Sequence, residues 1–257
     1  MDRMSADAAS DATWDAVARR LARARAPSTR AYRPLRVDGA IAGWLTPERA
    51  ARAAAFADVF VAAGDGIEFV PALTGPGARS RALAHVTETL AAEGALTAWR
   101  DERYAVAPAL GAAPWFELER AAARYFGVHT FAAHVNGLVR TDAGTAMWLA
   151  RRSPTKAIDA GMLDNLVGGG IAAGATIDST VVKEAWEEAG IPAAVAAGAR
   201  RVATLAIRRE QPDGLQWETI FAHDLWLPEA FVPANQDGEA VAHRRVPLAE
   251  AARLIAL

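Results

Sequence analysis

A glycine run followed by a sharply bounded acidic helix constrains this chain more than any other feature of its sequence. Three glycines stand together at 168–170, and helical spacing then extends from about Asp178 to Ala189. Gly190 and Pro192 end this helix, because glycine readily takes the left-handed conformation past a helix terminus and proline cannot continue a helix. Apolar residues precede the glycines, so the sequence predicts a strand, a backbone segment without side chains and a helix in succession.

Three carboxylates lie on one face of the predicted helix. Glu184, Glu187 and Glu188 are spaced i, i+3 and i+4, which puts their Cβ atoms about 5–6 Å apart. Like charges at this spacing repel, and acidic groups near a helix C-terminus oppose the helix dipole. A divalent cation such as Mg²⁺ or Mn²⁺ reverses both effects. The pattern favours a metal site, and a solvated acidic helix face is the alternative.

Composition narrows the classes of function. The chain has 257 residues, 28 basic and 30 acidic side chains, and a formal net charge of −2. This near balance favours neither nucleic acid nor a membrane surface as partner, which makes a small molecule the expected one. The absence of cysteine excludes disulfides and thiol nucleophiles. No apolar run reaches the roughly 20 residues that span a bilayer, and no secretory signal is evident, so we expect a cytoplasmic protein.

The chain divides into two expected domains. Residues 1–125 read as a small α+β domain and residues 126–257 as a second one. In the first, the expected elements are hairpins in 32–44 and 58–72, helices at 14–26, from Pro47, at 79–95 and at 115–125, and a strand in 99–109. In the second, they are strands at 128–140, 146–153, 201–208 and 216–227, a loop at 228–238 and a closing helix at 248–257.

The segment from Gly169 to Ile191 resembles the Nudix box, G-x5-E-x7-R-E-U-x-E-E-x-G-U, in which U is apolar. The agreements are Gly169, Glu184, Ala185, Glu187, Glu188, Gly190 and Ile191. From about Tyr32 onward, further stretches are similar to two-domain Nudix proteins related to the thiamin pyrophosphokinase fusion proteins and to plastid Nudix hydrolases. The resemblance implies a Nudix α/β/α sandwich preceded by a smaller N-terminal α+β domain.

Two positions depart from the box. Ala175 stands where the box has glutamate, and Lys183 stands where it has arginine. The two missing residues normally support each other, so the loss of one relaxes the need for the other. Lys183 is also one of only two lysines in this arginine-rich chain. We therefore expect its compact ammonium to orient Glu184, although chance retention would explain it too.

The candidate site extends beyond the helix. The expected catalytic residues are Lys183, Glu184, Glu187 and Glu188. Five residues are expected to bind the phosphates of the substrate, namely Arg151, Arg152, Lys156, Gly169 and Gly170. Nudix enzymes often add a later carboxylate to the metal site, and Glu239 is our choice over Asp237 and Glu218.

These features predict a metal-dependent pyrophosphohydrolase that uses Mg²⁺ or Mn²⁺. The resemblance implies thiamin diphosphate or its oxidised analogues as substrates, cleaved to a monophosphate and phosphate. One alternative is a degenerate Nudix module that only binds a nucleotide or diphosphate, for which Ala175 is the argument. An isopentenyl diphosphate isomerase would need a catalytic cysteine that the chain lacks. A homo-oligomer is compatible with the sequence, and the N-terminal domain is expected to serve substrate recognition or oligomerisation.

Overall fold

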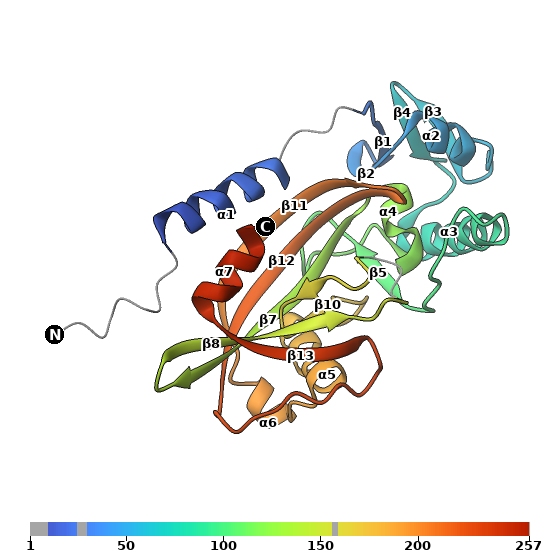
Figure 1. The fold of residues 1–257 in the computed structure, drawn as a ribbon. Helices are drawn as coiled ribbons and strands as arrows, with labels where there is room; N and C mark the ends of the chain where they lie inside the picture. Colours follow the sequence, from blue (N-terminus) through green and yellow to red (C-terminus); the bar gives the residue numbers. More distant parts are fainter. Residues whose placement is uncertain (1–9, 25–29, 156–158, 257) are drawn as a thin grey trace.

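The computed structural model describes residues 10–24, 30–155 and 159–256. Figure 1 shows a small mixed α/β unit formed by the N-terminal part and a larger sheet flanked by helices in the C-terminal part. None of the helices in these ranges has both the length and the hydropathy that crossing a bilayer requires. Lys156, which we expected to bind phosphate, lies outside the described residues.

A four-stranded sheet organises the N-terminal unit, with the strand order β2-β1-β4-β3. Its two hairpins form where the Asp-Gly and Gly-Asp turns predict them, since Asp38, Gly39 and Gly64 all have positive φ. The elements are α1 (Asp11–Ala24), β1 (Arg33–Val37), β2 (Ala40–Leu45), α2 (Pro47–Ala54), β3 (Phe60–Ala63), β4 (Gly66–Phe69) and α3 (Gly75–Ala92). Aromatic and aliphatic side chains from the four strands, α2 and α3 share one core, to which Phe126 also belongs.

A separate two-stranded hairpin follows, made of β5 (Arg103–Val106) and β6 (Phe116–Glu119). The expectation of a helix over 115–125 was therefore wrong in its first half. Phe116 and Leu118 alternate with Glu117 and Glu119, and the two apolar side chains are buried. Helical structure begins at η1 (Arg120–Ala122) and continues in α4 (Ala123–Phe126).

A seven-stranded mixed sheet forms the C-terminal part, with the main order β11-β12-β7-β8-β13. Its strands are β7 (His129–Thr141), β8 (Gly144–Arg152), β9 (Leu163–Asp164), β10 (Val167–Gly170), β11 (Arg200–Gln211), β12 (Gly214–Leu227) and β13 (Ala240–Pro247). β10 pairs with β7, and β9 pairs with β8. Residues 240–247 carry no strand signal in the sequence, yet this segment pairs with β8 along its length. The glycine run is part of a strand, β10.

Helices cover both faces of this sheet. α5 (Ile177–Ala189) and α6 (Ala193–Ala196) lie on one side, and α7 (Leu248–Ala256) lies on the other (Figure 1). Alternation along β8 explains the arrangement, because Trp148 packs into the core beneath α5 whereas Leu149 packs against α7. The C-terminal part is thus an α/β/α sandwich.

Candidate active site

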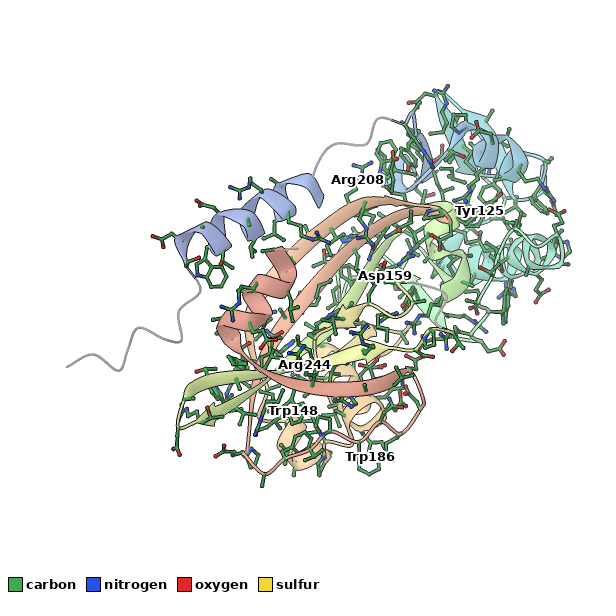
Figure 2. The ribbon with its side chains drawn as sticks, in the orientation of Figure 1. Tyr125, Trp148, Asp159, Trp186, Arg208 and Arg244 are labelled. Atoms are coloured by element: carbon green, nitrogen blue, oxygen red, sulfur yellow. The ribbon has the colours of Figure 1, made fainter. Side chains whose placement is uncertain are left out.

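α5 has well-defined ends because its sequence caps both of them. At the N-terminus, the Thr176 hydroxyl accepts a hydrogen bond from the Ser179 N–H at 3.1 Å, and the Ser179 hydroxyl accepts one from the Thr176 N–H at 2.9 Å. At the C-terminus, Gly190 adopts the left-handed conformation with φ 64°. The outward side of the helix carries Trp186, which is 53% exposed and points away from the sheet (Figure 2).

Lys183 holds two of the three box glutamates. Its Nζ donates to Glu184 Oε1 at 2.9 Å and to Glu187 Oε2 at 2.8 Å. Burial opposes the positive charge of Lys183, but its hydrogen bonds to Glu187 and Glu184 outweigh that effect and raise its pKa. The expected orientation of Glu184 by an ammonium is therefore visible in these contacts. A cation already lies between two carboxylates.

Glu184 is the most enclosed of the three. It is 8% exposed, and burial raises the pKa of its carboxyl group while the hydrogen bond and charge of Lys183 oppose the increase. Its carboxyl group rests on Gly169 of β10. A Cβ atom at Gly169 would lie 2.3 Å from the Glu184 Cδ, which is far inside van der Waals contact. The glycine is therefore required by close approach of the helix.

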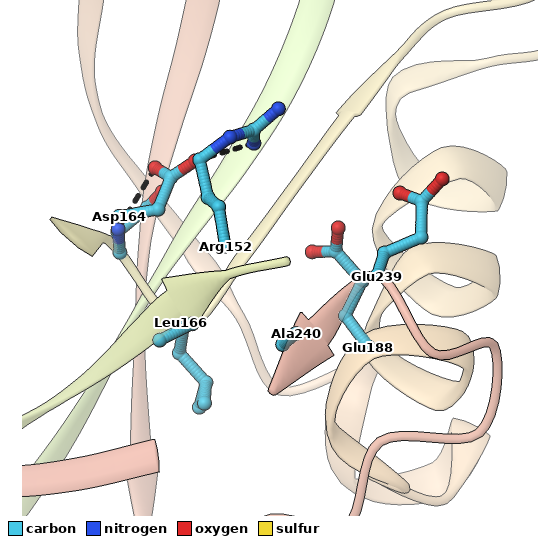
Figure 3. A pocket seen from close by; sticks show the side chains of 8 residues that line it. Arg152, Asp164, Leu166, Glu188, Glu239 and Ala240 are labelled. Atoms are coloured by element: carbon cyan, nitrogen blue, oxygen red, sulfur yellow. Dashed lines mark hydrogen bonds and ion pairs between the residues drawn. The ribbon is translucent and has the colours of Figure 1, made fainter. Parts of the chain in front are cut away.

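Glu188 connects the end of α5 to the same strand. Its Oε2 accepts a hydrogen bond from the Gly168 N–H at 2.7 Å. Glu188 also lines a pocket together with Glu239, which precedes β13. Figure 3 shows these two glutamates on one side of the pocket and the ion pair of Arg152 with Asp164, 2.9 Å apart, on the other.

The basic residues expected to bind phosphate have separate positions. The Arg152 side chain lines the pocket, whereas Arg151 is exposed and donates to the Gly161 carbonyl at 2.8 Å. Glu239 accepts a hydrogen bond from Arg100 of the N-terminal part at 3.2 Å. Arg152 and Glu239 thus share a pocket with Glu188, and Arg151 does not line it.

The two other carboxylates considered for the metal site have local partners. Asp237 accepts hydrogen bonds from the Glu239 N–H and from Asn235, which stabilises the turn before β13. Glu218 on β12 accepts hydrogen bonds from Gln216 and Thr130. Of the three candidates, Glu239 is the one that lines the pocket with Glu188.

The donor set suits a hard divalent cation, although its members are not gathered around one point. Across the described ranges, no group of three or more acidic or histidine side chains is arranged to hold a metal ion. The carboxylates of Glu184 and Glu187 share the Lys183 ammonium, and Glu188 turns to Gly168. Anionic oxygens on one helix face are nevertheless the ligands that Mg²⁺ and Mn²⁺ prefer, and the ammonium shows that a cation fits between two of them.

Sequence reasoning missed several residues at the site. Asp164 and Asn165 line the pocket beside Arg152, and both lie immediately before the glycine strand. Polar residues so close before a buried strand could have been predicted as site residues. Arg120 lies over the Tyr104 ring and its charge acts on Glu184, and no local pattern points to it.

Comparisons with known proteins agree with this arrangement. Residues 130–256 match the NUDIX domain, and residues 16–130 match a domain of unknown function, DUF4743. Nudix hydrolase 20, chloroplastic, of Arabidopsis thaliana is 40% identical over 180 residues, which are 70% of this chain and 48% of that protein. Nudix hydrolase 24, chloroplastic, of the same plant is 39% identical over 180 residues, 70% of this chain and 49% of that protein.

The chain spans about half the length of these curated relatives. Among solved structures, DR0079 from Deinococcus radiodurans is similar with 21% identity and a TM-score of 0.43, covering 59% of this chain and 98% of that one. The contacts between α5 and β10, the match of residues 130–256 and the two relatives all indicate the same family. The chain belongs to the Nudix hydrolase family, with an additional N-terminal domain in front of its Nudix domain.

Proposed function

We propose that this protein is a divalent-cation-dependent pyrophosphohydrolase. The observation that carries the proposal is the arrangement of α5 on β10, in which Glu184 and Glu187 share a cationic group and Glu188 binds the Gly168 N–H. Such an acidic cluster near a helix C-terminus is unfavourable for stability alone. A bound cation offsets this repulsion, because its positive charge attracts the carboxylates.

In this proposal Glu184, Glu187 and Glu188 hold Mg²⁺ or Mn²⁺, with Glu239 as an additional ligand. When bound there, such an ion would supply positive charge against a diphosphate and would make water more acidic at neutral pH. Either Glu184 or Glu239 accepts the proton of the attacking water. Lys183 keeps Glu184 ionised and oriented, which its contact at 2.9 Å supports.

The substrate proposed is thiamin diphosphate or an oxidised analogue of it. Water oxygen bonds to phosphorus, the P–O–P bridge breaks, and a monophosphate and inorganic phosphate leave. Arg152 lines the pocket and Arg151 lies on the neighbouring surface, so both are proposed to neutralise the diphosphate. Gly169 and Gly170, which we expected to contact phosphate, are covered by Glu184 and Tyr104 and are left out of this proposal.

A second candidate is a module that binds a diphosphate without cleaving it. Two observations favour it, namely Ala175 in place of the box glutamate and the Lys183 ammonium that occupies Glu184 and Glu187. A binding module has no need for three clustered carboxylates, so we place it second. The two candidates differ in turnover and not in ligand affinity.

A substrate panel tests both. The purified protein is incubated with thiamin diphosphate, oxothiamin diphosphate, ADP-ribose, NADH, coenzyme A and nucleoside triphosphates, each with Mg²⁺ and with Mn²⁺, and monophosphate products are identified. The proposal predicts cation-dependent turnover of a thiamin-type diphosphate. Saturable binding without turnover of any compound would favour the binding module, and turnover of another compound alone would refute the proposed substrate.

A further inference from the structure

The three glycines of β10 each lie against a different side chain. A Cβ atom added to Gly168 would meet the His134 ring at 2.9 Å, and one added to Gly169 would meet Glu184 at 2.3 Å. At Gly170 the obstacle is Tyr104, whose Oη, Cζ and Cε1 would lie at 1.9, 2.7 and 2.9 Å. The end of β10 is therefore enclosed by the Nudix helix on one side and by a tyrosine of the N-terminal part on the other.

Tyr104 belongs to β5, which is anchored next to the glycine strand. The Ala173 N–H, three residues after β10, donates a hydrogen bond to the Arg103 carbonyl at 2.8 Å. β5 lies beside β10 in Figure 1, and Tyr104 is 7% exposed. Two contacts, one through the side chain of Tyr104 and one through the backbone of Arg103, thus connect β5 to the segment that carries the glycines.

β10 depends on such support because it has little side-chain packing of its own. Three of its four residues are glycines, which contribute no side chains to packing and weaken a strand. Within the described residues β10 pairs with β7 alone. Its position relative to α5 consequently depends on what packs against its glycines.

Arg120 fixes Tyr104 in turn. The Arg120 guanidinium lies over the Tyr104 ring, 5.7 Å from its centroid, and pairs with Glu102 at 2.5 Å. Glu102 immediately precedes β5, so this ion pair connects the start of β5 to η1. The charge of Arg120 also acts on Glu184, where it favours the ionised carboxylate.

We infer that Tyr104 is a positioning residue of the Nudix site, which packs on Gly170 and keeps β10 against α5 so that Glu184 retains its place. The inference rests on the proposed function. It makes the N-terminal domain a structural part of the catalytic unit, in addition to any role in recognising substrate. Gly170 would then be glycine because of Tyr104, and not because a phosphate needs its backbone.

A double-mutant cycle in the full chain separates these explanations. Gly170→Ala alone introduces the clash with Tyr104, and Tyr104→Leu removes all three atoms that the new Cβ would meet. Gly77→Ala is the matched control, because the nearest atom there is the end of the Arg81 side chain at 3.4 Å. For each variant, kcat and KM are measured on the best substrate of the panel. Mn²⁺ affinity is measured from the electron paramagnetic resonance signal of free Mn²⁺, and stability is measured by thermal unfolding.

We expect Gly170→Ala to lower kcat about 100-fold with KM changed less than about threefold, because displacement of a reacting group by about 1 Å has that effect. Its Mn²⁺ affinity should fall as well. Gly170→Ala combined with Tyr104→Leu should show kcat within about threefold of Tyr104→Leu alone, which is strong non-additivity. If the leucine variants fail to fold, Tyr104→Phe combined with Gly170→Ala should recover part of the loss, since the nearest contact then changes from 1.9 to 2.7 Å.

Two results would overturn the inference. One is a folded Gly170→Ala protein with wild-type kcat and Mn²⁺ affinity. The other is a folded double variant whose kcat lies below that of Tyr104→Leu alone by the same factor that Gly170→Ala costs in the wild type, which would assign Gly170 to substrate contact. If the wild type turned over no compound of the panel, the proposed function would fail, while the pattern of Mn²⁺ affinities would still decide the role of Tyr104.

Discussion

Replacing Gly169 by alanine is the perturbation whose effect on the site can be worked out most directly. The new Cβ would lie 2.3, 2.4 and 2.7 Å from Cδ, Cγ and Oε1 of Glu184, whereas ordinary contacts begin at 3.4 Å. The atoms must therefore separate by about 1 Å, a displacement that lowers kcat about 100-fold when it affects a reacting group. Overpacking of this kind should also lower the free energy of unfolding by about 1–3 kcal/mol.

The assay is steady-state hydrolysis with saturating Mg²⁺, accompanied by urea unfolding to follow stability. Gly77→Ala again serves as the control, since it adds the same methyl group in α3, where there is room. Relaxation of Glu184 is hindered because its carboxyl group is buried and bound to Lys183. A Gly169→Ala protein with kcat within about threefold of wild type would refute the reasoning that β10 fixes the place of Glu184.

Three further predictions concern α5 and the loop before it. Glu188→Gln should lower kcat at least about 100-fold with little effect on folding, because it removes charge at the centre of the reaction, and activity within about threefold of wild type would contradict the assignment. Glu184→Gln should raise the melting temperature of the metal-free protein at pH 7. Folding raises the pKa of this carboxyl above its ordinary value of 4.5. The ionised carboxylate therefore lowers the free energy of unfolding at pH values above the folded-state pKa, and this effect is absent below pH 4.5. The stabilisation by Glu184→Gln should therefore disappear when melting curves are recorded at acid pH. A difference in melting temperature between variant and wild type that stays constant from pH 3 to 8 would show that burial of the carboxylate is not its cause. Ala175→Glu combined with Lys183→Arg, which restores the ordinary box, should be tolerated structurally without a gain in turnover, and a hundredfold gain would identify a decayed enzyme.

Local signals in the sequence predicted the elements whose ends are chemically marked. Gly190 and Pro192 locate the end of α5, and the Asp38-Gly39 pair locates the first hairpin turn. Such signals act over a few residues, so they do not depend on the rest of the fold. The acidic face of α5 was predictable for the same reason.

The errors occurred where local pattern was ambiguous. Residues 116–119 are too short for a period of two to be told from the start of a helix. β13 contains exposed Val241 and two arginines, Arg244 and Arg245, so it lacks the alternation of a strand with one buried face. Pairing with β8 makes it a strand, and that pairing joins residues 88 to 101 positions apart.

The contact between Tyr104 and Gly170 is of the same long-range kind. The two residues are 66 positions apart, and neither has a neighbour that points to the other. From the sequence we expected the backbone of Gly169 and Gly170 to approach a phosphate, whereas in the structure the glycine run lies against Glu184 and Tyr104. Which side chain it approaches is decided by how β5 packs beside β10, and only the three-dimensional structure contains that information.

A Mg²⁺ titration of the initial rate tests whether the glutamates of α5 support cation-dependent hydrolysis. The wild type and Glu187→Gln are assayed on the best diphosphate of the panel after treatment with EDTA. The account predicts no hydrolysis in EDTA, recovery with Mg²⁺ or Mn²⁺, and at least about tenfold more Mg²⁺ for half-maximal rate in Glu187→Gln, since loss of a carboxylate ligand weakens the site. Hydrolysis that persists in EDTA, or identical Mg²⁺ dependence in the two proteins, would contradict it.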